Sequence, residues 1–139
     1  GNLGFGFQTA LGVKVGNPDK VVISITGDGG FMFGLQELAT AAQEQIGLIT
    51  IVMNNSAFGN VRRDMRRLYK RQPVVSEFQN PDFSALAEVF GIDGYHVESP
   101  AELRTALEQA IEKDSPALIN VKVDRNMEKS PWKYIMMNY

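Results

Sequence analysis

The apolar positions of this chain follow two patterns, short continuous runs and longer stretches with helical spacing. The runs are rich in β-branched residues and predict buried strands, whereas apolar residues spaced three and four apart predict helices. The predicted strands are 21–26, 48–53, 95–97 and 117–123. The predicted helices are 1–16, 35–45, 61–71, 80–90 and 100–113. Their alternation predicts an α/β fold, a doubly wound, mainly parallel sheet with helices on both faces.

Local signals refine this outline. The first strand is almost continuously apolar, which predicts burial on both of its faces. Gly91 ends one helix, and Ser99 with Glu102 forms a capping box at the start of the next. Glycine is a poor helix former, so we expect the glycines at 4, 6 and 12 to allow close approach of a ligand or a neighbouring segment.

Polar residues follow the first two strands at their carboxyl ends. Gly27-Asp28-Gly29-Gly30 comes directly after the first strand, and Asn54-Asn55 comes directly after the second. In an open α/β sheet both groups reach the same crevice, where ligands bind. Oxygen ligands beside free backbone N–H groups suit a hard cation and a phosphate.

An Mg²⁺ ion could be shared between this crevice and a bound diphosphate. Asp28 offers a carboxylate oxygen, Asn55 an amide oxygen, and the loop 56–59 a backbone carbonyl, while phosphate and water oxygens would complete an octahedron. Gly29 and Gly30 leave N–H groups open toward the phosphates. Taken singly, an Asp or an Asn at a strand end is more often only a turn residue.

The sequence excludes two other phosphate-binding motifs, the dinucleotide-binding fingerprint and the P-loop. A dinucleotide fingerprint beginning at Gly27 would need a small residue where Met32 stands, and an acidic residue where Asn54 and Asn55 end the second strand. The Gly-Lys-Ser/Thr of a P-loop is missing.

Composition narrows the class of protein. A net charge of −2 gives no reason to expect nucleic acid or a membrane as partner. The sequence has no cysteine, which excludes disulfides, thiolate catalysis and cysteine-ligated zinc, and fits a cytoplasmic location. The chain does not begin with Met, and it begins inside a glycine-rich stretch, so we expect it to be part of a longer polypeptide.

The spacing of the two polar groups resembles a known cofactor motif. Gly27-Asp28-Gly29, followed after 24 residues by Asn54-Asn55, is similar to the motif of thiamine-diphosphate-dependent enzymes. Further stretches resemble the acetolactate synthase, pyruvate oxidase and benzoylformate decarboxylase group, namely 4–12, 36–40, 58–62 and 68–69. The resemblance covers nearly the whole chain and corresponds to the family's C-terminal, diphosphate-binding domain, here 1–125 with a docking tail at 126–139.

The resemblance implies a role for individual residues. The implied Mg²⁺ ligands are Asp28, Asn55 and the carbonyl of Ala57. The implied diphosphate contacts are the backbone of Gly29, Gly30, Phe58 and Gly59. Leu3 would wedge under the thiamine diphosphate and bend it, and the carbonyl of Gly1 would accept from its aminopyrimidine. The bend places the amino group of the pyrimidine beside C2 of the thiazolium, whose proton must leave.

The resemblance further implies an Mg²⁺-dependent 2-oxo acid decarboxylase or carboligase similar to acetolactate synthase. In that family a Glu on a pyrimidine-binding domain, from another segment or subunit, activates the cofactor, so we expect no turnover from this chain alone. The full-length protein would be a homodimer or homotetramer, with Trp132 and Tyr134 of the tail as packing anchors. Two alternatives stay open: the small subunit of a two-chain decarboxylase of the sulfopyruvate or phosphonopyruvate type, and a non-catalytic relative.

The basic run at 62–71 and the single histidine are two further features of the sequence. The basic run at 62–71 predicts a solvated or interface-facing side of a helix, with an anionic substrate as the alternative. Within it, Asp64 stands where acetolactate synthases carry a Trp that shapes the second-substrate pocket, which weakens that specific activity. His96, the only histidine, lies far from the motif and is expected to be structural or exposed.

Overall fold

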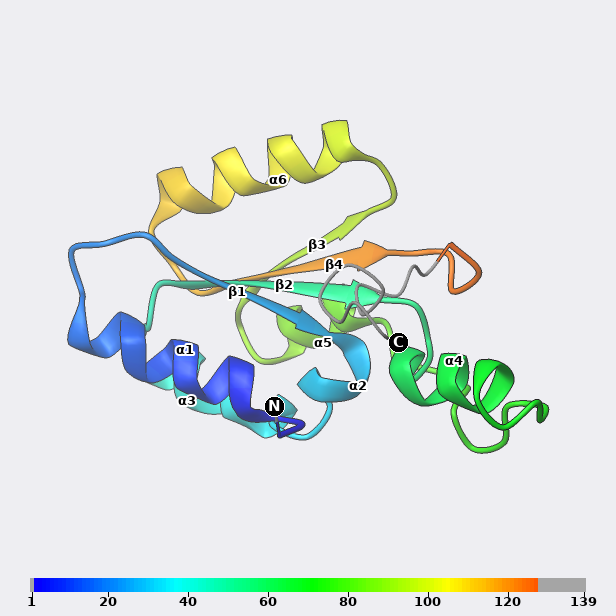
Figure 1. Cartoon of the computed structure of the whole chain (residues 1–139). Helices are drawn as coiled ribbons and strands as arrows, with labels where there is room; N and C mark the ends of the chain where they lie inside the picture. The colour runs from blue at the N-terminus through cyan, green and yellow to red at the C-terminus, as the bar shows by residue number, and fades with distance from the viewer. Residues whose placement is uncertain (1, 128–139) are drawn as a thin grey trace, which may run out of the picture.

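The fold is a four-stranded parallel sheet with helices on both faces, as a computed structural model covering residues 2–127 describes it (Figure 1). The strands are β1 (Val22–Gly27), β2 (Leu48–Asn54), β3 (Asp93–Val97) and β4 (Ala117–Lys122). Their order across the sheet is β1-β2-β4-β3, and every neighbouring pair is parallel. The predicted fold class is therefore confirmed.

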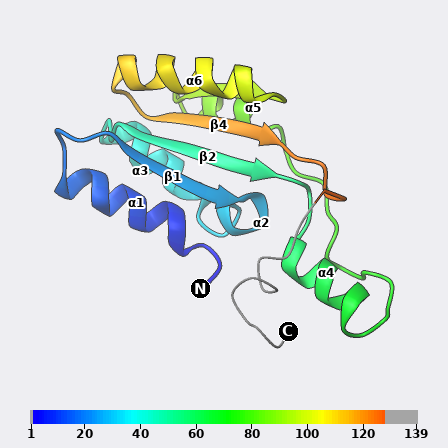
Figure 2. The same cartoon turned by 45° about the horizontal axis from the view of Figure 1, so that its top comes forward.

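The helices form two layers around this sheet. They are α1 (Phe5–Gly16), α2 (Asp28–Phe31), the 3₁₀ turn η1 (Leu35–Glu37), α3 (Leu38–Gln43), α4 (Gly59–Arg67), α5 (Phe83–Val89) and α6 (Pro100–Lys113). Figure 1 shows α6 on one face and α1, α3 and α5 on the other, and both Figures 1 and 2 show α4 projecting beyond the carboxyl ends of the strands.

The central strand β2 separates two apolar cores. Leu48 and Val52 face the core beneath α1, α3 and α5, and Ile49 and Ile51 face the core beneath α6. Three phenylalanine rings hold the larger core together, because Phe31 packs edge-on against Phe7 at 5.2 Å and against Phe83 at 5.4 Å. These rings come from α1, α2 and α5, so they fix the loop after β1 to the rest of the domain.

The prediction that the first strand is buried on both faces is wrong. Ile25 is 70% exposed and Ile23 is 42% exposed, although both are apolar. The reason is the position of the strand, since β1 is the edge of the described sheet and α6 packs mainly on β2, β3 and β4. One face of β1 is therefore buried, and the other face is apolar but exposed to solvent in the described chain.

Several predicted helix boundaries also differ. The expected loop after β1 contains the short helix α2, and the expected helix over 35–45 begins as a 3₁₀ turn and ends at Gln43. The helix expected over 61–71 ends at Arg67, because Lys70 takes a left-handed conformation with φ of 53°. The capping box of Ser99 and the stop at Gly91, with φ of 77°, are confirmed.

Glycines in the first helix do not share one purpose. Gly4 has φ of 85°, and a side chain there would meet Phe33 at 2.8 Å, as expected for close approach. A side chain at Gly6 or Gly12 would meet no described atom within 4 Å, so close approach of a neighbouring described segment is wrong at both positions, whereas close approach of a ligand stays a prediction.

Trp132 and Tyr134, which the sequence predicts to dock on another part of the protein, lie outside the described residues. Among residues 2–127, no helix combines the length and apolar character needed to cross a membrane.

We predict that Phe31→Ala lowers the free energy of unfolding by about 3–5 kcal/mol, since it removes a fully buried ring that contacts two others. Urea denaturation of the full-length protein measures the change. Val89→Ala is the control, because that side chain is 82% exposed and its loss should cost less than about 0.5 kcal/mol. Equal losses for the two variants would contradict the central position of Phe31.

Candidate functional site

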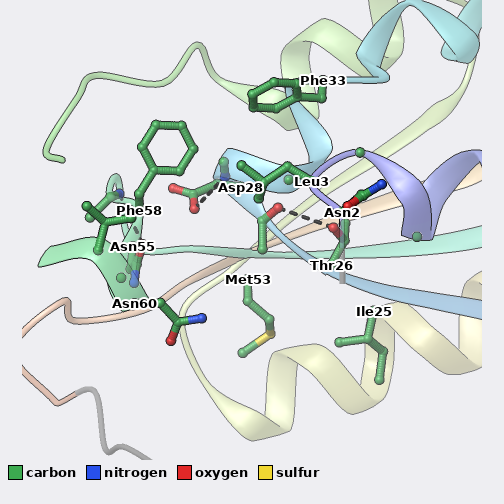
Figure 3. A pocket seen from close by; sticks show the side chains of 18 residues that line it. Asn2, Leu3, Ile25, Thr26, Asp28, Phe33, Met53, Asn55, Phe58 and Asn60 are labelled. Atoms are coloured by element: carbon green, nitrogen blue, oxygen red, sulfur yellow. Dashed lines mark hydrogen bonds between the residues drawn. The ribbon is translucent and has the colours of Figure 1, made fainter. Parts of the chain in front are cut away.

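A cleft of about 890 Å³ lies at the carboxyl ends of β1 and β2. Its walls come from the N-terminal end of α1, the β1–α2 turn, the loop after β2 and the start of α4 (Figure 3). The cleft brings together the described residues that the sequence predicted for the site, namely Leu3, Asp28, Gly29, Gly30, Asn55, Ala57, Phe58 and Gly59. Gly1, the remaining predicted residue, lies outside the described part of the chain.

The carboxylate of Asp28 is buried, with only 2% of the residue exposed. Its Oδ1 accepts from the N–H of Gly29 at 2.9 Å. Its Oδ2 accepts from the N–H of Ser56 at 2.7 Å and from Nδ2 of Asn80 at 2.7 Å. Among the described residues the charge is therefore held by hydrogen bonds and by no ion pair, an arrangement that a bound cation would stabilise.

The two asparagines after β2 have different surroundings. Asn55 lines the cleft, and its Oδ1 accepts from the N–H of Ala57 at 3.0 Å. Asn54 points away from the cleft, where its Nδ2 donates to Oδ1 of the buried Asn120 at 3.1 Å. The second asparagine of the pair is thus the one whose oxygen is available to a ligand in the cleft.

Sequence reasoning missed two of the groups that hold Asp28. The sequence places Asn80 only at the start of a helix, since Asn-Pro is a common turn signal, and nothing in its spacing from Asp28 indicates contact. Ser56 adopts a left-handed backbone with φ of 54°, which is uncommon for a residue other than glycine. Such positive φ values are found at ligand sites and depend on the surrounding structure for support.

Close packing explains the glycine after Asp28. A side chain at Gly29 would lie 2.6 Å from the ring of Phe58, which is itself packed edge-on against Phe78 with ring centres 4.9 Å apart. A side chain at Gly30 would approach Oγ1 of Thr26 at 3.3 Å. The missing Cβ at Gly29 therefore lets the ring of Phe58 pack on the turn. The prediction of an N–H group open toward a phosphate is wrong for Gly29, because that N–H donates to Oδ1 of Asp28.

Most of the remaining side chains of the cleft wall are apolar, and Asn2, Thr26 and Asn60 are its other polar members. Leu3 is 58% exposed and Phe33 is 56% exposed, and Figure 3 shows Asp28 between Leu3 and Phe58. Apolar side chains that remain exposed around a polar centre are typical of a ligand groove or an interface. The lining residues include no Lys, Arg or His within the described chain, so an anionic ligand beside Asp28 would need a cation between them.

An internal ion-pair network holds the helix that closes the cleft. Arg62 on α4 is 6% exposed, and its guanidinium donates to Glu77 at 2.6 Å, to the carbonyl of Arg125 at 3.1 Å and to Asn126 at 3.0 Å. The hydrogen bond from Arg62 keeps the pKa of Glu77 below its ordinary value. The expectation of a solvated or interface-facing basic run is therefore wrong for Arg62, which ties α4 to two other segments.

His96 and Asp64 both lie outside the cleft lining. His96 on β3 is hydrogen-bonded through Nδ1 to Asn120 and through Nε2 to Glu98, each at 3.3 Å. Asp64 on α4 forms an ion pair with Arg63 at 3.3 Å.

The donor set of the cleft fits an Mg²⁺ ion that is shared with a phosphate ligand. No group of three or more His, Cys, Asp or Glu side chains gathers within residues 2–127, so these side chains provide no complete cage there. Asp28, Asn55 and a loop carbonyl instead supply a few hard oxygens, and Mg²⁺ is usually bound by one or two carboxylates together with substrate phosphates.

Comparison with known proteins identifies close similarity over most of the chain. The sequence is 44% identical over 125 residues to a probable acetolactate synthase large subunit of Methanococcus aeolicus, covering 89% of this chain and 21% of that protein. It is 35% identical over 125 residues to the acetolactate synthase isozyme 2 large subunit of Escherichia coli K12, covering 89% and 23%. The chain spans about a fifth of the length of these curated relatives.

A solved structure shares the fold. The thiamine diphosphate-dependent 4-hydroxybenzoylformate decarboxylase of Rhodococcus jostii RHA1 superposes with a TM-score of 0.82 at 34% identity, over 88% of this chain and 23% of the other. Residues 1–121 match the family described as thiamine pyrophosphate enzyme, C-terminal TPP binding domain. Since that match covers most of the sequence, the chain belongs to the thiamine pyrophosphate enzymes, as their C-terminal cofactor-binding domain.

Proposed function

We propose that this chain is the diphosphate- and Mg²⁺-binding domain of an enzyme that decarboxylates a 2-oxo acid and transfers the remaining fragment to a second substrate, similar to acetolactate synthase. The pyrimidine-binding domain and its activating Glu would come from another segment or subunit of a homodimer or homotetramer. The identity to acetolactate synthase subunits supports the reaction class.

The observation that carries this proposal is the buried carboxylate of Asp28, which has no ion pair among the described residues and shares its cleft with Asn55. A diphosphate brings further negative charge to a cleft that already holds one carboxylate. Asp28, Asn55 and the carbonyl of Ala57 would hold an Mg²⁺ ion, whose charge would relieve this repulsion.

The residues around the ion would bind and orient the cofactor. The backbone of Gly29, Gly30, Phe58 and Gly59 would hold the diphosphate. Because the N–H of Gly29 donates to Asp28 and that of Phe58 donates to the carbonyl of Ser76, the donors to the phosphates would be the N–H groups of Gly30 and Gly59. Leu3 would support the bent shape of the cofactor from below. The apolar wall would exclude water from the reacting carbon, which strengthens electrostatic interactions within the cleft. When bound, thiamine diphosphate supplies the electron sink that decarboxylation of a 2-oxo acid requires.

Decarboxylation without transfer is a second candidate, and Asp64 favours it. This position corresponds to a Trp that shapes the second-substrate pocket in acetolactate synthases, and here it carries a carboxylate paired with Arg63. The similarity to a 4-hydroxybenzoylformate decarboxylase supports the same alternative.

We predict that Asp28→Ala abolishes Mg²⁺-dependent binding of thiamine diphosphate to the full-length protein, because it removes the carboxylate ligand of the ion. Isothermal titration calorimetry with and without Mg²⁺ measures this binding. Asp19→Ala is the matched control, since Asp19 is exposed in the turn after α1 and should leave the affinity unchanged. Unchanged affinity in Asp28→Ala would refute the assignment of this residue to the metal.

We also predict that Gly29→Ala weakens thiamine diphosphate binding. The added methyl group would push the ring of Phe58 and shift the turn away from the diphosphate, and we expect the Kd to rise about 10-fold, which corresponds to about 1.4 kcal/mol of binding free energy. Gly12→Ala serves as the control, because a methyl group there meets no described atom within 4 Å. The same calorimetric titration compares them, and an equal Kd for the two variants would contradict the proposed approach of the backbone to the diphosphate.

A panel of 2-oxo acids offered to the full-length protein tests the reaction itself. We expect CO₂ release that depends on both thiamine diphosphate and Mg²⁺. Product analysis separates the two candidates, since an acyloin-type product indicates transfer and a free aldehyde indicates decarboxylation alone. Tight cofactor binding without CO₂ release from any member of the panel would instead favour a non-catalytic relative.

A further inference from the structure

Asn80 forms a hydrogen bond with the buried carboxylate of Asp28. Its Nδ2 donates to Oδ2 of Asp28 at 2.7 Å and to Oδ1 of Asn54 at 2.8 Å. Asn80 is not among the residues that line the cleft. This side chain can therefore act on a ligand in the cleft only through the residues that it holds, directly through Asp28 and more remotely through Asn54, which precedes Asn55.

The two oxygens of the Asp28 carboxylate differ in how many hydrogen bonds they already accept. Each oxygen of an ionised carboxylate accepts at about two lone-pair positions. Oδ2 accepts from the N–H of Ser56 and from Asn80, so both of its positions are used. Oδ1 accepts from the N–H of Gly29 alone among the described residues, so one position stays open.

The donor group of Asn80 is held in place on both sides. Its second proton is bound by Asn54, whose own amide is oriented by the buried Asn120 at 3.1 Å. The rings of Phe83 and Phe31 pack against each other with their centres 5.4 Å apart. Phe83 follows Asn80 by three residues, and Phe31 follows Asp28 by three residues. The segments that carry Asn80 and Asp28 are thus joined by a hydrogen bond and by a core contact.

We propose that Asn80 is a positioning residue that limits Asp28 to one free oxygen and thereby favours Mg²⁺ over Ca²⁺ in the cleft. Mg²⁺ demands near-ideal octahedral geometry, whereas Ca²⁺ accepts more ligands and carboxylates that bind through both oxygens. A carboxylate whose Oδ2 is fully occupied binds through Oδ1 alone. The inference rests on the proposed function, in which Asp28 is a metal ligand.

Metal titrations of the full-length protein test the selectivity. Mg²⁺ and Ca²⁺ are titrated separately in the presence of saturating thiamine diphosphate, and calorimetry gives a Kd for each ion. In Asn80→Ala the Kd for Mg²⁺ should rise about 10- to 100-fold, as is usual when a group that orients a metal ligand is lost. The Kd for Ca²⁺ should change several-fold less, because a freed Oδ2 can join its coordination shell.

Two further variants keep the test independent of folding. Asn80→Leu has a similar volume and removes the donor without leaving a cavity. Ser84→Ala, on the same segment, removes the hydroxyl that donates to Asp82, the residue before α5, and does not contact Asp28. Ser84→Ala should leave both Kd values and their ratio at the wild-type values, with thermal unfolding recorded for all variants.

The outcomes separate this inference from the function on which it rests. A fall in the Mg²⁺/Ca²⁺ preference in either Asn80 variant supports it. An unchanged preference, including equal weakening of both ions, overturns it and assigns Asn80 a purely structural role. If the wild-type protein binds neither ion with thiamine diphosphate, the proposed function fails and this inference fails with it.

Discussion

A buried carboxylate with no ionic partner in the described chain is the feature on which the site depends. Asp28 would be costly to bury alone, and three hydrogen bonds from three separate segments offset that cost. The same bonds join the turn after β1, the loop after β2 and the segment before α5. The hydrogen bonds that form the site therefore also hold these three segments of the domain together.

The parallel sheet explains why these segments meet. Gly27 of β1 is in register with Met53 of β2, so the residues that follow each strand emerge side by side. β4 lies next to β2 and places Asn120 where it can orient Asn54. The ring of Phe31 then fixes the turn from below through its contacts with α1 and α5.

The apolar surface around the cleft fits a domain that shares its ligand with another part of a larger protein. Leu3, Phe33 and Ile25 remain more than half exposed, and the outer face of β1 is bare of helices in the described chain. The chain spans only about a fifth of its curated relatives, which leaves a large part of each relative without a counterpart here. Under the proposed function, that part would cover this surface and bring the activating carboxylate.

The sequence by itself determined the order of strands and helices, the parallel class of the sheet, and the cleft residues Asp28 and Asn55. These follow from local apolar patterns, from capping and from polar residues at strand ends, all of which are written in short stretches of chain. Only the tertiary structure decided that β1 is exposed, that Arg62 is internal and that Asn80 holds Asp28. Each of these depends on which distant segments pack together, and no local pattern in the sequence encodes the neighbour of a side chain 52 residues away.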